Sequence, residues 1–143
     1  MPFYRCLIPT GSLSFDQRQA ISAAITDVHC GLTNAPRRFV NVIFLEVDDG
    51  SEIADSHGNG TLSYKTPYFV AGGNRAGRAP EMKQQILDEL LARISEISGV
   101  PRHEVSGHIS DAPASWTMEG GKILPDPGAE SAEWYDPVGT STS

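Results

Sequence analysis

The chain has 143 residues and a formal net charge of −7. This acidic balance argues against nucleic acid and anionic membrane surfaces as partners, because both select basic proteins. With 39% hydrophobic and 20% charged residues the composition is that of an ordinary globular protein, and the length favours one domain with its own core. No apolar run approaches the roughly 20 residues that cross a bilayer, and the N-terminus lacks the regions of a signal peptide.

The two cysteines, Cys6 and Cys30, do not form a CxxC pair. Their number and spacing fit a reducing compartment better than a disulfide framework, and they make a structural zinc site improbable. The sequence therefore predicts a cytoplasmic, acidic, globular domain that holds no metal.

An internal repeat with an offset of 65 residues organises the chain. The segment TNAPRRFVNV at 33–42 aligns with SGVPRHEVSG at 98–107, and the same offset places the opening MPFY on TPYF at 66–69 without a gap. Chance alignments seldom keep one register across a strand, a helix and a turn, so the pattern indicates a duplicated unit. We expect a single domain over 1–143 with four parts: a first unit at 2–47, a loop at 48–64, a second unit at 66–111 and a C-terminal arm at 112–143.

The first unit is predicted to be a strand, a helix and a strand. The opening PFYRCLI alternates like a half-buried strand. Ser14 with Gln17 offers a capping box for a helix from about Phe15 to His29, which Gly31 is expected to end. The run VNVIFL at 40–45 is the next strand.

The second unit repeats this order. A strand is expected from Pro67 to Ala71, and Pro80 occupies the first position of a helix that stops before Gly99. A last core strand follows at 105–109. One apolar stripe lines the inner side of the second helix, and its members are Met82, Ile86, Leu90, Ile94 and Ile97.

These elements predict the fold class. Strands joined through helices pair in parallel with right-handed crossovers. Two tandem βαβ units therefore give an α/β sandwich, with a four-stranded, mainly parallel sheet and two helices on one face. The other face needs a cover, for which a second subunit is the natural candidate. The apolar side chains after Pro113 indicate an arm packed on a surface.

Some residues suggest chemistry. Inside a chain Pro2 is an amide that simply starts an edge strand, whereas removal of Met1 makes it a secondary amine that takes or gives a proton. Arg75 and Arg78 follow a strand and precede a helix N-terminus, where two guanidinium groups can hold a small carboxylate or lie in a solvated loop.

Two further residues are ambiguous alone. His29 continues the line of Ile21 and Ile25 along the first helix and so points toward the apolar side, where a histidine is usually a core residue. Glu119, in TMEGGK, reads as a surface glutamate.

Taken together, the chain resembles the tautomerase superfamily and, within it, the cis-3-chloroacrylic acid dehalogenase family. The resemblance covers nearly the whole chain and rests on Pro2, the run ITDVHCGLT that ends the first helix, NRAGR, and MEGGKILPDPG followed by EWYD. It implies Pro2 as the catalytic amine, Arg75 and Arg78 as binders of the substrate carboxylate, and His29 and Glu119 as residues that bind or activate water. It also implies a homotrimer and a small carboxylate substrate, without metal or organic cofactor.

The sequence departs from that family at one point. A family tyrosine positions the water from the last core strand, whereas His108 aligns here and becomes the expected fourth catalytic side chain. Histidine is shorter and titrates near neutrality. We therefore expect a keto–enol tautomerase with weak cis-3-chloroacrylate hydratase/dehalogenase activity.

Two alternatives stay open. One is a hydratase or decarboxylase of another small unsaturated or β-keto acid. The other is a non-enzymatic trimeric binding protein whose proline is vestigial.

Overall fold

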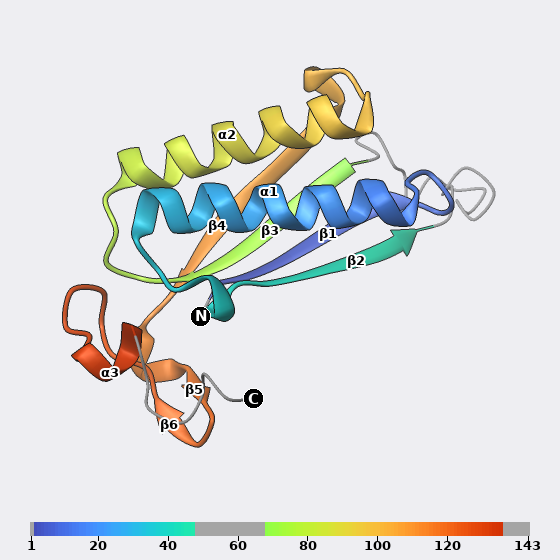
Figure 1. Cartoon of the computed structure of the whole chain (residues 1–143). Helices are drawn as coiled ribbons and strands as arrows, with labels where there is room; N and C mark the ends of the chain where they lie inside the picture. Colours follow the sequence, from blue (N-terminus) through green and yellow to red (C-terminus); the bar gives the residue numbers. More distant parts are fainter. Residues whose placement is uncertain (1, 48–67, 136–143) are drawn as a thin grey trace, which may run out of the picture.

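The computed structural model describes residues 2–47 and 68–135. Its sheet has four strands, β1 Phe3–Pro9, β2 Asn41–Val47, β3 Tyr68–Arg75 and β4 Val105–Ala112, in the order β2-β1-β3-β4. Two long helices, α1 Phe15–Thr33 and α2 Pro80–Ser98, lie side by side on one face of this sheet (Figure 1). The predicted α/β fold of two tandem βαβ units is confirmed.

The strand pairing decides where the functional residues meet. β1 pairs with β2 in parallel, and β3 pairs with β4 in parallel, while β1 and β3 run antiparallel at the centre. Phe3 lies opposite Gly73 in this central pair. The start of the first unit therefore lies beside the end of the first strand of the second unit.

The repeat is visible in the helices. Helix α2 begins 65 residues after α1, at 80 against 15, and ends 65 residues after it, at 98 against 33. The short 3-10 turns at Arg37–Phe39 and Arg102–Glu104 keep the same offset, 102 − 37 = 65.

The central strands differ from this register by one residue. Phe3 pairs with Asn41 in the first unit. In the second unit Ser106 corresponds to Asn41 at an offset of 65, and it pairs with Phe69. Phe69 is therefore the counterpart of Phe3, at an offset of 69 − 3 = 66. A slip of one residue moves side chains to the opposite face of a strand, so the core-facing positions fix the register. The gap-free alignment of MPFY with TPYF is therefore wrong by one residue in this strand; Pro67 lies outside the described residues.

Helix α1 begins as predicted and ends later. The capping box is present, because the Gln17 N–H donates to Ser14 Oγ at 3.1 Å and the Ser14 N–H donates to Gln17 Oε1 at 2.9 Å. The expectation that Gly31 ends this helix is wrong. Asn34 instead takes the left-handed conformation, with φ 59°, and its N–H donates to Cys30 O at 2.9 Å. His29 therefore lies a full turn inside the helix.

Helix α2 follows the prediction at both ends. Pro80 occupies its first turn, and Gly99 ends it in the left-handed conformation with φ 77°. Ile86, Leu90 and Ile94 of the predicted stripe are buried, together with Leu91. No helix among residues 2–47 and 68–135 is long and apolar enough to cross a membrane.

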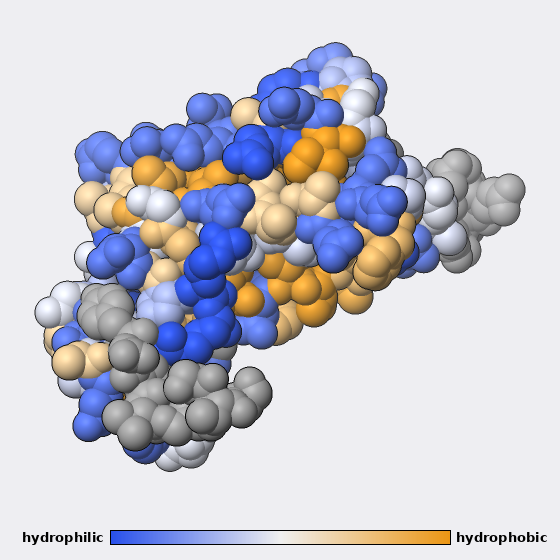
Figure 2. Space-filling view, viewed as in Figure 1, coloured by the Kyte–Doolittle hydropathy of each residue, from blue (hydrophilic) through white to orange (hydrophobic). Residues whose placement is uncertain are grey.

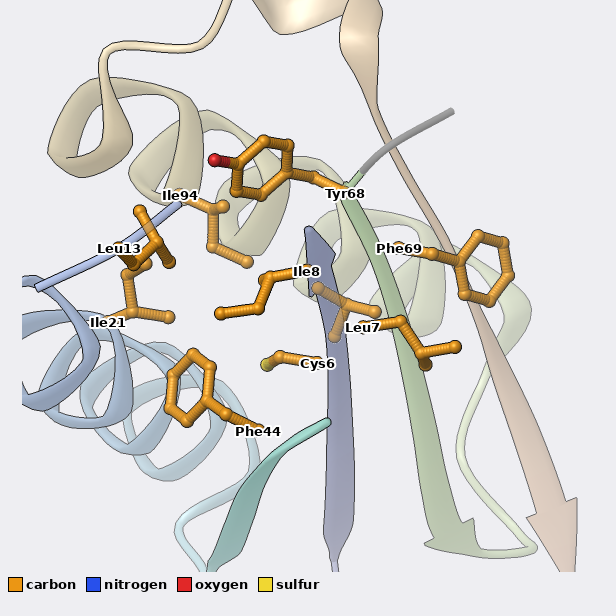
Figure 3. A pocket seen from close by; sticks show the side chains of 10 residues that line it. Cys6, Leu7, Ile8, Leu13, Ile21, Phe44, Tyr68, Phe69 and Ile94 are labelled. Carbon is orange, nitrogen blue, oxygen red and sulfur yellow. The ribbon is translucent and has the colours of Figure 1, made fainter. Parts of the chain in front are cut away.

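The core lies between the sheet and the helices. In Figure 3 the side chains of Cys6, Ile8 and Ile94 converge there, whereas Leu7 and Phe69 point to the other side of their strands. The open face of the sheet keeps apolar side chains in contact with solvent, among them Phe3, Ile43 and Leu45, which are 36%, 37% and 44% exposed. Hydrophobic residues gather over β2 in Figure 2.

The C-terminal arm folds back on its own chain. It contains a hairpin of β5 Met118–Glu119 and β6 Lys122–Ile123, followed by a single helical turn, α3 Ala132–Tyr135. Gly120 and Gly121 have φ of 57° and 79°, as a two-residue hairpin turn requires. The Trp134 ring stacks on Phe39 at 4.4 Å between centroids, so the arm docks beside the turn that precedes β2.

Candidate functional site

The candidate site lies where the start of β1 meets the end of β3. Pro2 is buried there, and its carbonyl oxygen accepts a hydrogen bond from the Asn41 N–H at 3.0 Å. Because Phe3 lies opposite Gly73, continuing the register places Pro2 opposite Asn74. Side chains alternate along a strand, so Pro2 shares the helix-facing side of β1 with Tyr4. The predicted catalytic amine thus belongs to a buried position between sheet and helices.

A hydrogen bond to the Tyr4 hydroxyl fixes the position of the His29 ring. The Tyr4 hydroxyl and His29 Nδ1 are hydrogen-bonded at 2.8 Å, and both residues are 0% exposed. Burial raises the pKa of Tyr4 above its ordinary range, so the phenol keeps its proton. When the phenol donates this proton to Nδ1, the proton of the neutral His29 ring sits on Nε2.

The protonation state of His29 follows from its surroundings. Burial, followed by the positive charge of Arg78, lowers the pKa of His29 to about 3. The ring is therefore neutral at neutral pH. Its Nε2 is buried without a hydrogen-bond partner among the described residues. In the tautomer that accepts from Tyr4, this Nε2 carries an N–H that no described acceptor binds.

Gly72 makes room for this arrangement. A Cβ atom at Gly72 would stand 2.6 Å from Cε1 of the Tyr4 ring, closer than packed side chains allow. We expect Gly72→Ala to displace the ring, to break its bond to His29 and to destabilise the fold by about 1–3 kcal/mol, as overpacking does. Urea unfolding followed by circular dichroism measures this. Gly73→Ala is the matched control, since a Cβ atom there meets only Phe3 O at 3.8 Å; equal losses in both variants would contradict the steric account.

Arg75 is occupied by the arm. Its guanidinium donates from Nη1 to the Pro125 carbonyl at 2.5 Å and from Nη2 to Glu130 Oε1 at 2.8 Å, and both side chains of the ion pair are about 95% buried. Burial alone would raise the pKa of Glu130, but the bonds from Arg75 and from the Gly128 N–H hold that pKa below its usual range. Arg75 thus binds a carboxylate of its own chain.

The guanidinium of Arg78 makes fewer hydrogen bonds than that of Arg75 among the described residues. Within residues 2–47 and 68–135 its guanidinium makes one long hydrogen bond, from Nη1 to the Arg75 carbonyl at 3.4 Å. Burial and then the charge of Arg75 lower the pKa of Arg78, although a guanidinium stays charged at neutral pH. Its charge acts on both Tyr4 and His29. Arg78 therefore supplies positive charge to the site.

Glu119 reaches the site from the arm. It ends β5, directly before the glycine turn, and the following strand leads to Pro125, which Arg75 binds. Glu119 Oε2 is buried without a hydrogen-bond partner among the described residues, and burial raises the pKa of this carboxyl. Glu119 also lines a pocket of about 620 Å³ between the arm and Phe39, together with Lys122 and Trp134.

His108 stands apart within this chain. It lies on β4 and pairs with Ala71 of β3, which is three positions before Asn74, the residue opposite Pro2. Its exposed ring lies 5.4 Å from the ring of Phe69, measured between centroids. Gly107 faces helix α2, so His108 faces the open side of the sheet. The structure brings Pro2, His29, Arg75, Arg78 and Glu119 to one end of the sheet and leaves His108, on the open side of β4, away from that end.

Three residues of this region escape reasoning from the sequence: Tyr4, Asn74 and Glu130. The alternation of β1 marks Tyr4 as a core residue, but the partner of its hydroxyl depends on tertiary structure. In the described parts of the chain no three His, Cys, Asp or Glu side chains form a group that could hold a metal ion.

The comparisons define the class of this protein. The family described as putative oxalocrotonate tautomerase enzymes matches residues 1–137. The fold and this match place the chain among the enzymes of the tautomerase superfamily. The chain belongs to this family of putative oxalocrotonate tautomerases. No curated protein matches it.

The solved structures that are similar to it include the following three. The native crystal structure of Ps01740 is 34% identical, with a TM-score of 0.71 over 82% of this chain and 99% of that one. N1, a member of the cis-3-chloroacrylic acid dehalogenase family, is 25% identical, with a TM-score of 0.80 over 98% and 94%. FG41 malonate semialdehyde decarboxylase, inhibited by 3-bromopropiolate, is 25% identical, with a TM-score of 0.63 over 85% and 92%. The resemblance to the tautomerase superfamily and to its cis-3-chloroacrylic acid dehalogenase family is confirmed.

Proposed function

We propose that this protein is a keto–enol tautomerase that uses Pro2, freed by removal of Met1, as general base and acid on small unsaturated carboxylates. The observation that carries the proposal is the gathering of Pro2, His29 and Arg78 at the junction of β1 and β3. Burial and neighbouring cations disfavour the ammonium form of an amine. This environment favours Pro2 as a free amine that takes the proton of an enol and returns it to carbon.

The other residues divide the remaining work. Arg78 holds the carboxylate and stabilises negative charge as it develops on the enolate. Arg75 adds charge nearby; it binds substrate directly only if Glu130 leaves it. Neutral His29 cannot act as a cationic acid near pH 7, so it donates a hydrogen bond from Nε2 to an oxygen of the substrate or of water.

A weaker hydratase/dehalogenase activity follows from the same residues. On cis-3-chloroacrylate the minor ammonium form of Pro2 gives its proton to C2, while Glu119 removes a proton from water that adds to C3. The chlorohydrin that results loses chloride and a proton to give malonate semialdehyde. The reaction is expected to be slow because the free amine predominates and because His108 replaces a tyrosine.

A decarboxylase of a small β-keto acid is the second candidate. The similarity to FG41 malonate semialdehyde decarboxylase, over 85% of this chain, favours it. A cation beside the carbonyl and a donor from His29 would stabilise the enolate left by loss of carbon dioxide.

We also propose a homotrimer, acting in the cytoplasm. The apolar side chains of Phe3, Ile43 and Leu45 on the open sheet face support an interface between copies. His108 lies on that same face, so an assembly would place it against a neighbouring subunit, which is how it would reach a site.

The proposed function is tested with purified protein and three substrates. We expect ketonisation of 2-hydroxymuconate to be the fastest reaction, and chloride release from cis-3-chloroacrylate to be at least about 100-fold slower, the cost of a misplaced group in a water-activating set. Carbon dioxide release from malonate semialdehyde tests the decarboxylase. Intact mass spectrometry establishes whether Met1 is removed; retained Met1 with no turnover of any substrate would favour the binding protein instead.

A further inference from the structure

The buried amide of Asn74 lacks a hydrogen-bond partner among the described residues. It lies on β3 between Gly73 and Arg75 and is only 5% exposed. Both Oδ1 and Nδ2 are shielded from solvent, and neither has a hydrogen-bond partner among the described residues. Buried polar groups are almost always paired, because an unpaired one costs about 1–3 kcal/mol. Two unpaired groups on one side chain therefore need an explanation.

The surroundings of Asn74 point to the candidate site. It shares the helix-facing side of β3 with Gly72, where an added side chain would collide with the Tyr4 ring. The Asn74 amide is close enough to the Tyr4 hydroxyl to oppose the rise in the pKa of that hydroxyl, although neither amide atom reaches hydrogen-bonding geometry with it. By strand register Asn74 lies opposite Pro2. The Tyr4 hydroxyl is hydrogen-bonded to His29 Nδ1, and the other ring nitrogen, His29 Nε2, also lacks a partner among the described residues.

We propose that Asn74 is a further substrate-binding residue of this site: its Oδ1 accepts a hydrogen bond from the Pro2 amine, and its Nδ2 donates to the enolate oxygen of a small α-keto or α-hydroxy-alkenoate. The inference rests on the proposed function and deepens it. An amide suits both tasks because it carries one acceptor and two donors and remains neutral at every working pH. The stability lost by leaving this amide unpaired is recovered when substrate binds.

The chemistry makes a specific division of roles. Oδ1 orients the Pro2 nitrogen, so that its lone pair faces the proton to be removed. Nδ2 and His29 Nε2 supply two donors for the oxygen on which negative charge develops. Removal of one such donor typically costs about 10²–10³ in kcat. The substrate must therefore carry an enolisable oxygen as well as the carboxylate held by Arg78.

The test separates a binding role from a structural one. Asn74→Leu replaces the amide by an apolar group of similar size. We expect a melting temperature equal to or above that of the wild type, together with a kcat about 100-fold lower. Asn41→Leu is the matched control, because the Asn41 amide is satisfied by a bond to Phe39 O at 3.1 Å; this variant should melt at a lower temperature.

A second variant tests whether Asn74 lies close to the Pro2 amine, without measuring turnover. Asn74→Asp places a carboxylate beside the Pro2 amine and should raise its pKa by about one unit, as an opposite charge at contact distance does. Titration of ¹⁵N-labelled Pro2 by NMR measures this in the processed protein. An unchanged titration, or an Asn74→Leu variant that melts early and turns over at the wild-type rate, overturns the inference. If the amine titration moves and no substrate is turned over, the proposed function fails while the placement of Asn74 beside Pro2 stands.

Discussion

Replacing Pro2 by alanine is expected to lower kcat for ketonisation by about 10²–10⁴, the usual contribution of general acid–base catalysis. The variant should still fold, because the Asn41 N–H bonds the backbone carbonyl of residue 2 and not its ring. The ring matters because it makes the amine secondary and fixes its direction inside a buried site. Steady-state kinetics on protein of verified N-terminal mass provides the measurement.

The control for this experiment is Pro67→Ala. The repeat gives Pro67 almost the same local sequence as Pro2, but an internal proline is an amide and has no basic nitrogen. Its replacement should leave kcat unchanged. A Pro2→Ala enzyme with the wild-type rate would remove the proline from the mechanism, and equal losses in both variants would indicate damage to the fold.

The fold could be predicted because its signals are local. Capping residues and an apolar stripe on each helix act over short stretches of chain, and the repeat with its offset of 65 residues shows that the same unit occurs twice. The errors occurred where local signals compete with tertiary geometry. Gly31 offers a place to end α1, yet Thr33 Oγ1 donates to His29 O at 2.7 Å and the helix continues to Thr33, with Asn34 as its C-cap. The repeat kept its register in the helices and shifted by one residue in the central strand, because the core fixes which side chains face inward.

The candidate site was only partly predictable. Resemblance pointed to Pro2 and Arg78, whose chemistry is evident from residue type and position. No sequence pattern shows that Arg75 is bound by Glu130, 55 residues away, or that Tyr4 holds His29, 25 residues away. Such contacts arise only when the arm and α1 are docked. His108 is different, because its position three residues before the level of Pro2, on the open side of the sheet, separates it from Pro2 and His29 within one chain.

Lowering the pH should destabilise this protein through His29 more steeply than its acidic groups alone would. The folded state holds the pKa of His29 near 3, whereas an unfolded histidine titrates near 6.5. Between these values the unfolded chain binds a proton that the folded chain does not, so stability rises with pH and falls as pH drops below about 6.5. One pKa unit corresponds to 1.36 kcal/mol, so the loss relative to pH 7 reaches about 2 kcal/mol at pH 5 and about 3 kcal/mol at pH 4.

The His29→Gln variant isolates this contribution. A glutamine carbonyl can still accept from the Tyr4 O–H, but it does not titrate. Both proteins share the Arg75–Glu130 pair, whose carboxyl also loses its stabilising effect as acid protonates it, so this effect cancels in the difference between them. Urea unfolding at pH 7, 6, 5 and 4 should show the wild type losing stability faster than the variant across this range. Parallel profiles would mean that His29 takes up its proton at nearly the same pH in the folded and the unfolded protein, which would contradict the lowered pKa of its ring.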